Sequence, residues 1–161
     1  MTNNHDTTTW LTPAAYQKLQ DELEQLTTVG RRELEERIAE ARSHGDIREN
    51  AEYDVAKNDQ GLMEARIRKI QGILENAQVE QVEDSGAVGV GTIATVRDDD
   101  GDELEIFVAP TENKHPGLVL ASPDSPLGGA LLGAQPGDDV SYEAPGGTFT
   151  YRVLSVRVYE G

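Results

Sequence analysis

The apolar residues of this chain change their spacing near residues 77–91, and that change limits the possible folds more than any other feature. Before it, apolar residues recur at steps of three and four, which is the period of an α-helix. After it, they fall in short stretches separated by Gly and Pro, which is typical of β-strands. The sequence therefore predicts an α+β protein made of two structurally different parts.

The first part predicts a long helix that begins at Thr12-Pro13, because Thr is a favourable N-cap and Pro fits the first helical position. The apolar stripe breaks at a polar stretch around Gly30 and then resumes. We expect this stripe to comprise Tyr16, Leu19, Leu23, Leu26, Leu34, Ile38 and Ala41. Gly45 is suited to leaving the helix, because Gly tolerates positive φ.

A second helix is expected from just after Gly45 to near Asn76. Its predicted apolar stripe is Val55, Leu62, Ile67, Ile70 and Leu74, with Ala51, Ala56, Ala65 and Ala77 as small packing residues. Two helices of about 30 residues joined by so short a loop must be antiparallel neighbours, so we expect a coiled-coil hairpin about 45 Å long. A seam this narrow leaves no room for a pocket, and function is therefore expected at the tip, in residues 42–53.

The second part predicts a small antiparallel sheet with one short helix covering a face. The expected strands are 91–97, 103–109, 117–122, 138–143 and 148–158, and the expected helix is 126–134. The alternation of apolar residues slips by one at Val153-Leu154, which predicts a β-bulge or a strong bend. The expected domains are a disordered tail (1–10), the helical hairpin (11–79), a linker (80–90) and the sheet domain (91–161).

The net charge of −16 argues against free nucleic acid as a direct partner, because such binding needs clustered Lys and Arg. Residues 1–80 hold 16 acidic and 10 basic side chains, and residues 81–161 hold 14 and 4, so the few basic residues matter by their position. The chain has no Cys, a polar start and no apolar run of the roughly 20 residues that span a membrane. We therefore expect a cytoplasmic protein without a membrane segment.

Two interpretations of the tip acids Asp46 and Glu49 remain open from their spacing. They could form a capping box at the start of the second helix. They could also be a pair of metal-binding carboxylates, but Mg²⁺ requires an octahedron of oxygen ligands, and two carboxylates do not make a tight site alone. Under the second interpretation they would complete a metal site whose other ligands lie on a different macromolecule.

Basic side chains surround this acidic tip. Arg42 and Lys57 are expected in opposing positions on the two arms, and Arg48 lies between the two acids. In so acidic a protein, cations near the end of a protrusion are suited to a phosphate backbone. The alternative is that these cations only pair with nearby acids, namely Glu40, Asp54 and Asp59.

The tip and much of the remaining chain resemble the bacterial Gre transcript-cleavage factors, most closely the GreA branch. The tip carries Gly45-Asp46-Ile47-Arg48-Glu49-Asn50-Ala51-Glu52-Tyr53, and the second half carries Ser122-Pro123-Asp124-Ser125-Pro126-Leu127-Gly128 and Pro145-Gly146-Gly147. The resemblance covers nearly the whole chain from Leu11. The chain departs from the usual family pattern at Asp54, Asn58 and Asp59, which weakens the case for a strong RNA-binding patch and does not touch the two acids.

The resemblance implies a factor that binds RNA polymerase and has no active site of its own, and we expect it to be a monomer. Its FKBP-like C-terminal domain would dock through the loop Asp124, Ser125 and Pro126, and its hairpin would enter the secondary channel. Asp46 and Glu49 would share the second Mg²⁺ with the polymerase, which then cleaves backtracked RNA. Arg42, Arg48 and Lys57 would face the RNA 3′ segment, and Asn50 and Tyr53 would support the tip or the transcript.

Other functions are less well supported by the sequence. A regulator that occupies the channel and inhibits without promoting cleavage is the main alternative, and a coiled-coil adaptor without a polymerase role is a third. An EF-hand around Gly101 would place Val96 and Phe107 at positions that need oxygen ligands, so the acidic run 98–103 predicts a solvated hairpin turn. An FKBP-like fold alone does not indicate isomerase activity.

Overall fold

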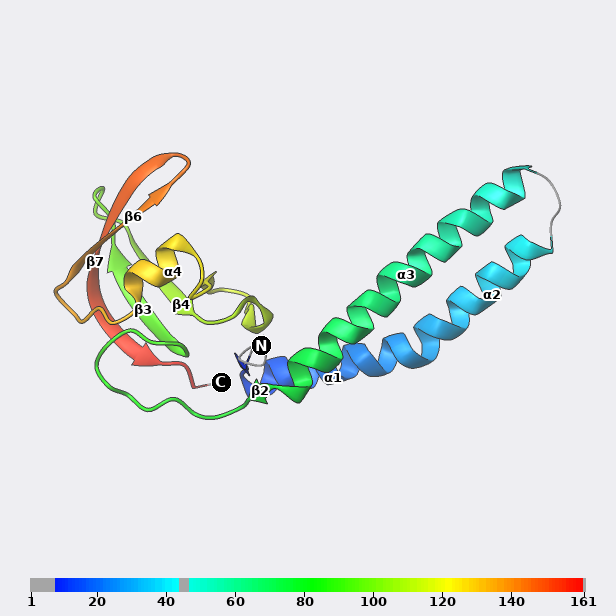
Figure 1. Cartoon of the computed structure of the whole chain (residues 1–161). Helices are drawn as coiled ribbons and strands as arrows, with labels where there is room; N and C mark the ends of the chain where they lie inside the picture. The colour runs from blue at the N-terminus through cyan, green and yellow to red at the C-terminus, as the bar shows by residue number, and fades with distance from the viewer. Residues whose placement is uncertain (1–7, 44–46, 161) are drawn as a thin grey trace, which may run out of the picture. The chain divides into compact units, whose positions relative to one another are not determined.

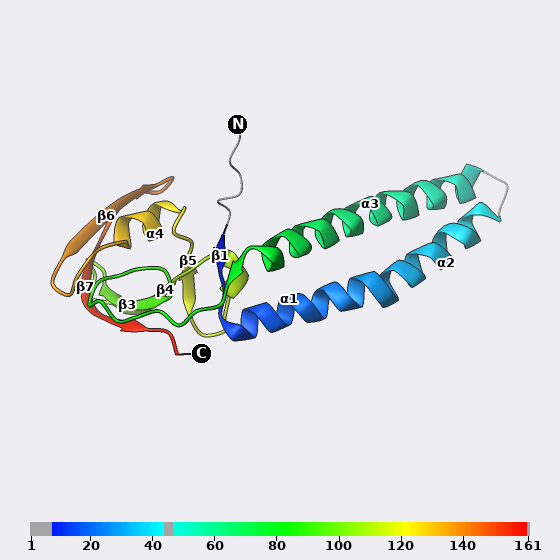
Figure 2. The same cartoon turned by 60° about the horizontal axis from the view of Figure 1, so that its bottom comes forward.

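The computed structural model describes residues 8–43 and 47–160, with side chains throughout except at 47–50. These residues form two compact units, a helical unit over Tyr16–Asn76 and a sheet unit that joins Thr8–Ala15 to Ala77–Gly161 (Figures 1 and 2). A long helical hairpin and a C-terminal sheet together confirm the α+β prediction. Within the described ranges, none of the helices combines the length and the apolar character needed to cross a membrane.

The first arm of the hairpin begins where the sequence predicted. Helix α1 spans Pro13–Gln25, and the Thr12 hydroxyl oxygen accepts a hydrogen bond from the backbone N–H of Ala15 at 3.0 Å. This is the N-cap contact that satisfies one of the free N–H groups of the first turn. The arm continues through a π-helical turn, η2 (Leu26–Gly30), into α2 (Arg31–Arg42).

The π-turn explains how one apolar stripe runs the whole length of this arm. The step from Leu26 to Leu34 is one residue longer than a heptad, and a π-turn accommodates one extra residue within a helix. Two hydroxyls satisfy carbonyls of the preceding turn, Thr27 donating to Leu23 O at 2.8 Å and Thr28 to Glu24 O at 2.6 Å. Leu34 and Ile38 are therefore buried after the interruption.

The second arm, α3 (Ile47–Glu75), corrects part of the predicted stripe. Ala56, Ile67 and Ile70 are buried, but Val55 and Leu62 are exposed. The prediction joined two different faces of the helix, because the five residues from Leu62 to Ile67 turn the helix by about 140°. Ala51 and Ala65, expected as packing positions, are exposed as well.

Ion pairs cross between the arms beside the buried seam. Arg31 donates from Nε and Nη2 to the two Glu64 carboxylate oxygens, both at 2.9 Å. Glu22 and Arg66 make a similar two-bond pair at 2.7 Å, and Arg37 Nη2 lies 3.0 Å from Asp59 Oδ2. Partners later in the first arm pair with earlier residues of α3, as antiparallel arms require.

The sheet unit contains a five-stranded sheet in the order β5-β4-β3-β7-β6. Its elements are β3 (Thr92–Arg97), β4 (Glu103–Val108), η3 (Thr111–Asn113), β5 (Val119–Ala121), α4 (Pro126–Leu131), β6 (Asp139–Ala144) and β7 (Gly147–Val158). The turn between β3 and β4 uses the predicted acidic run, where Asp98 Oδ1 accepts from the backbone N–H groups of Asp100 and Asp102, both at 2.9 Å.

The pairing of these strands confirms the bulge and corrects the antiparallel prediction. Thr95 pairs with Ser155 while Val96 pairs with Val153, so Leu154 is the extra residue of a β-bulge. The sheet is mixed rather than antiparallel throughout, because β5 pairs with β4 in parallel. The connection through η3 is long enough to return the chain to the starting end of β4, which a parallel neighbour requires.

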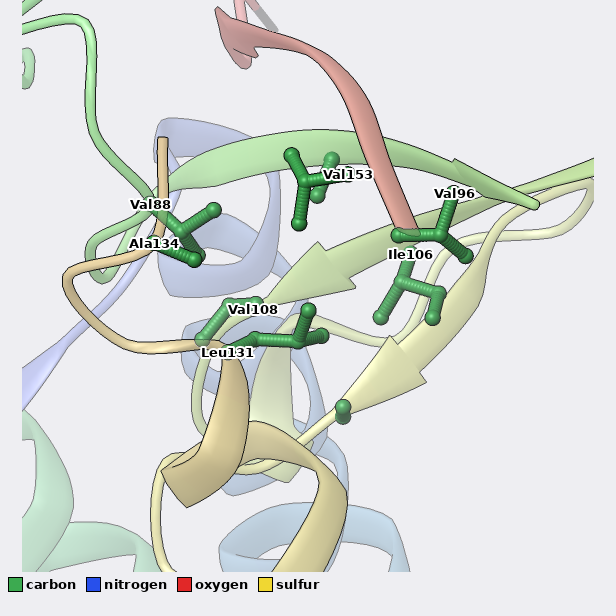
Figure 3. Close-up of a cluster of buried hydrophobic side chains, with 9 residues drawn as sticks. Val88, Val96, Ile106, Val108, Leu131, Ala134 and Val153 are labelled. Atoms are coloured by element: carbon green, nitrogen blue, oxygen red, sulfur yellow. The ribbon is translucent and has the colours of Figure 1, made fainter. Parts of the chain in front are cut away.

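Apolar side chains cover both faces of the central strands of this sheet. On one face, α4 and the flanking loops close over a cluster comprising Val88, Ala94, Val96, Ile106, Val108, Ala121, Leu131, Ala134 and Val153 (Figure 3). On the other face Phe107 is fully buried, stacked on Tyr159 at 4.6 Å between ring centroids and edge-on to Trp10 at 6.2 Å. Two covered faces make this unit a packed platform.

The N-terminal residues 8–15 belong to the sheet unit. Strand β1 (Thr9–Trp10) pairs in parallel with β2 (Ala77–Gln78), so residues 9 and 10, which we assigned to the tail, are ordered in a strand. Buried Asn113 fixes this segment, because its Oδ1 accepts from the Thr12 N–H at 2.8 Å and its Nδ2 donates to Trp10 O at 2.9 Å. No local pattern in the sequence predicts this role for Asn113.

Candidate functional site: the hairpin tip

The structure describes the helices on both sides of the tip but not the side chains of its two acids. Asp46 lies outside the described residues, as do His44 and Gly45. Arg48, Glu49 and Asn50 lie in the first turn of α3 by their backbone, and their side chains lie outside the description. The capping-box interpretation and the metal-binding interpretation of Asp46 and Glu49 therefore both stay predictions.

The tip lies between the C-terminus of one helix and the N-terminus of the next, so the two helix dipoles favour charges of opposite sign on its two sides. Helix α2 ends at Arg42, and Ser43 closes it by donating from its N–H and its hydroxyl to Glu40 O, at 3.1 and 2.7 Å. Helix α3 starts at Ile47, so Glu49 lies at a helix N-terminus, where the helix dipole favours negative charge. Arg42 lies in the last turn of α2, where the same dipole favours a cation.

Arg42 contacts Tyr53 across the two arms. Its Cζ lies 5.7 Å from the Tyr53 ring centroid, within the range of a cation–π contact, and its Nη2 donates to the Tyr53 hydroxyl at 3.4 Å. The hydrogen bond from Arg42 lowers the pKa of the Tyr53 phenol. Among the predicted tip residues whose side chains the structure describes, Arg42 and Tyr53 are in direct contact.

Two of the three basic residues predicted to face RNA, Arg42 and Lys57, form no ion pair with the described acids. We weighed pairing with Glu40, Asp54 or Asp59, but Arg42 bonds Tyr53, and Lys57 Nζ bonds Gln60 Oε1 at 3.1 Å on its own helix. Asp59 pairs with Arg37 instead. Among the side chains that the structure describes, neither Arg42 nor Lys57 is in an ion pair, and both are exposed. The side chain of Arg48, the third predicted cation, lies outside the description.

A groove opens between α2 and α3 beside the tip, which the sequence analysis did not expect. Its volume is about 490 Å³. It is lined by Arg37, Glu40 and Ala41 from α2 and by Ala51, Glu52, Val55 and Ala56 from α3. The alanines at facing positions are the sequence signal that could have indicated it, because small side chains leave space between neighbouring helices.

No group of three or more His, Asp or Glu side chains is placed to hold a metal ion in the described part of the chain. The side chains of Asp46 and Glu49 lie outside that part. Carboxylate oxygens are the ligands that Mg²⁺ accepts, so the chemistry of these two acids fits the ion. Their number does not complete its octahedron.

The predicted docking loop caps helix α4 in the sheet unit. The Ser125 Oγ accepts from the Gly128 N–H at 3.0 Å and donates to Ser122 O at 2.7 Å. Both hydrogen bonds of this side chain therefore stabilise the loop itself. Asp124 and Pro126, on either side of it, are exposed. Gly128 is required there, because a Cβ at this position would lie 1.9 Å from Ser122 O.

Comparison with known proteins covers both units. Residues 9–79 match a family described as transcription elongation factor, N-terminal, and residues 83–158 match one described as transcription elongation factor, GreA/GreB, C-term. The chain is 41% identical over 165 residues to transcription elongation factor GreA of Streptomyces coelicolor, covering 100% of both chains. It is also 41% identical over 150 residues to GreA of Acetivibrio thermocellus, covering 91% of this chain and 94% of the relative.

Solved structures give a further likeness. GreA factor homolog 1 (Gfh1) of Thermus thermophilus is 28% identical, with a TM-score of 0.43, and the match covers 92% of this chain and 98% of that one. With both halves matched and identity near 40% over the full length, the chain belongs to the GreA/GreB family of transcription elongation factors.

Proposed function

We propose that this protein binds RNA polymerase, inserts its hairpin tip into the secondary channel and stimulates Mg²⁺-dependent cleavage of backtracked RNA. The observation that carries the proposal is the sequence Gly45-Asp46-Ile47-Arg48-Glu49-Asn50 at the turn of a two-armed helical hairpin. In this proposal the polymerase supplies the active site, and the chain is not itself an enzyme. It acts as a monomer in the cytoplasm, on stalled transcription complexes.

Asp46 and Glu49 are the proposed ligands that this chain contributes to the shared ion. Held by these two carboxylates together with ligands of the polymerase, the ion would supply activation of a water molecule for attack on a phosphodiester. The chain's own contribution is to present two carboxylates together at the end of a narrow rod. Glu49 lies in the first turn of α3, where the helix dipole favours a negatively charged side chain.

Exposed cations around the tip support a role next to RNA. Arg42 and Lys57 are not in ion pairs with described acids, and Arg48 follows Asp46 by two residues. We assign these three to the phosphates of the RNA 3′ segment, and Asn50 and Tyr53 to support of the tip. The contact of Tyr53 with the Arg42 guanidinium supports that assignment, because it limits where the cation can point.

We assign binding of the polymerase surface to the sheet unit. We expect this unit to have an FKBP-like fold. Asp124, Ser125 and Pro126 form the proposed polymerase-docking loop. Ser125 holds this loop by its two hydrogen bonds, which leaves Asp124 and Pro126 exposed to a partner.

The test uses a stalled, backtracked transcription complex with labelled RNA. Adding the protein should shorten the transcript from its 3′ end when Mg²⁺ is present. Asp46→Asn should abolish this shortening while polymerase binding is retained, because the change removes a charged ligand and keeps the side-chain volume. Asp54→Asn is the matched control, because Asp54 is an exposed acid of α3 outside the proposed metal pair.

Three results would count against the proposal. Normal cleavage with Asp46→Asn would remove this residue from the assigned role. Slowed elongation without any cleavage by the wild-type protein would favour an inhibitor that occupies the channel. Failure to bind the polymerase at all would favour a structural adaptor.

A further inference from the structure

Helix α3 carries two apolar stripes, of which the hairpin buries only one. The inner stripe is buried or half-buried against the other arm and comprises Ala56, Met63, Ile67, Ile70 and Leu74. Every residue of the outer stripe is exposed, and the stripe comprises Ala51, Val55, Asn58, Leu62 and Ala65. Its members follow one another at steps of four and three, so they lie in one line along the helix, about 140° around from the inner stripe.

The outer stripe contains unusually exposed aliphatic side chains. Val55 is 56% exposed and Leu62 is 65% exposed, the largest fractions among the large hydrophobic residues that the structure describes. Single exposed apolar residues are common on proteins and need no explanation. Here two such residues are seven apart on one face, with small alanines at both ends of the line. That alignment is the pattern of a helix that packs against a partner.

The stripe also continues into the groove beside the tip. Ala51 and Val55 belong to both features, and the groove adds Ala41 from the opposite arm. Charged side chains at the groove, Arg37, Glu40 and Glu52, accompany these small apolar residues. An apolar line bordered by charges is typical of a surface that binds protein rather than a phosphate backbone.

The area of the stripe argues against a second copy of this chain as the occupant. From Ala51 to Ala65 the helix rises about 21 Å, and one helix face is about 10 Å wide, so the stripe offers roughly 200 Å². A stable dimer buries about 800 Å² on each partner. A contact this small contributes only when another contact already holds the partner, because the second binding event is then intramolecular.

We propose that the outer stripe of α3 and the adjoining groove form a docking surface for an apolar protein patch on the wall of the polymerase channel. This inference rests on the proposed function, in which the sheet unit supplies the first contact and the hairpin enters the channel. The stripe then stabilises the inserted hairpin and acts on binding, whereas the tip acids act on cleavage. The partner is a set of aliphatic or aromatic side chains lining the channel, and not RNA.

The experiment measures binding and cleavage separately for a variant that makes the stripe polar. The double variant Val55→Gln/Leu62→Gln places polar residues of good helix propensity at exposed positions, so the hairpin should keep its helical content by circular dichroism. We expect its dissociation constant for the transcription complex to rise about tenfold, which corresponds to losing the burial of about two methylene groups. The factor concentration giving half-maximal cleavage should rise equally, with the maximal rate unchanged.

The control is Ala39→Gln, because Ala39 is an exposed residue of α2 outside the stripe and the groove. It should leave both quantities unchanged. Sedimentation measures the oligomeric state of the wild-type protein and of the double variant. If the wild type is a dimer and the double variant is a monomer, the proposal is overturned in favour of a second copy. Unchanged binding of the double variant would overturn it too, as would a lower maximal rate at unchanged affinity.

Separate readouts distinguish this inference from the proposed function. If the wild-type protein binds the polymerase without stimulating cleavage, the cleavage proposal fails and the binding comparison still decides the inference. If cleavage is normal and the double variant binds like wild type, only the inference fails. Absence of polymerase binding by the wild-type protein overturns both.

Discussion

The two units of this protein are stabilised in different ways. The sheet unit covers both faces of its central strands, and Phe107, Ile106 and Val153 are fully buried. The helical unit has a single narrow seam, supplemented by ion pairs on its surface. A hairpin of this kind gains little burial per residue, and it keeps most of its surface available to a partner. The contrast is between a packed sheet unit and a thin helical hairpin.

The same contrast separates stability from function. In the sheet unit, buried polar groups such as the Asn113 side chain make hydrogen bonds that stabilise the fold. On the hairpin, the exposed features are the cations near the tip and the outer stripe of α3. Substitutions in the sheet unit should therefore change stability most, and substitutions on the outside of the hairpin should change stability least.

Phe107→Ala should have the largest effect. The change removes a fully buried ring together with its contacts to Trp10 and Tyr159, and such changes cost about 3–5 kcal/mol. Denaturant unfolding should be followed by fluorescence of Trp10, the single Trp, for the sheet unit and by far-UV circular dichroism for the helices. If both signals shift together by the same amount, the two units unfold as one. The sheet unit and the helical unit then do not differ in their free energies of unfolding.

Ile70→Ala should destabilise the hairpin by a smaller amount. Ile70 is fully buried in the seam, and truncating such a residue costs about 2–5 kcal/mol. We expect a value near the lower end, because two helices can move together to close the space. Leu62→Ala is the matched control and should lie within about 0.5 kcal/mol of wild type, since Leu62 is exposed. Equal losses in the two variants would contradict the assignment of inner and outer stripes.

Asn113→Ala should cost about 1–3 kcal/mol, because it leaves the backbone N–H of Thr12 and the carbonyl of Trp10 without their partner. The effect should appear in the Trp10 fluorescence transition. Hydrogen exchange should also speed up at Thr12, whose N–H is bound by the Asn113 side chain. Unchanged exchange at Thr12 would mean that the β1–β2 pairing fixes this segment without Asn113.

Glu22→Gln should have the smallest effect and a defined pH dependence. The hydrogen bonds from Arg66 lower the pKa of Glu22 below its ordinary value of 4.5. A carboxylate with a lowered folded-state pKa stabilises the fold above 4.5, and this contribution is lost as the pH falls through the folded-state pKa. At neutral pH we expect a loss of about 0.2–1 kcal/mol that shrinks in high salt, because the pair is partly exposed.

A pH titration of the helical transition provides the check. The difference between wild type and Glu22→Gln should narrow as the pH falls below 4.5. A difference that stays constant down to low pH would show that the carboxylate charge does not act through Arg66.

Several elements could be predicted from sequence because their signals are local. Thr12-Pro13 set the start of α1 through capping geometry, and the slip at Val153-Leu154 located the bulge. The period of the apolar residues separated the helical part from the strands. The tip sequence at 45–50 directed attention to the working end of the hairpin, since its residue types suggest a definite chemistry.

Other features depend on which segments meet in space. The spacing of Val55 and Leu62 is helical whether they face the other arm or solvent, so the choice between two stripes followed only from the position of that arm. The parallel pairing of β5 required the path of the chain through η3. The contact between Arg42 and Tyr53 joins residues on different arms, and neither residue alone predicts it.

The sequence by itself therefore determined the two kinds of structure, the helix start, the strands, and the residue types at the tip. These follow from short-range periodicity and capping, which a helix or strand expresses wherever it lies. Tertiary structure decided which stripe of α3 is buried, which cations pair, and which polar side chain anchors the N-terminal segment. Burial and pairing depend on distances between segments far apart in the chain, and only packing of the whole unit sets those distances.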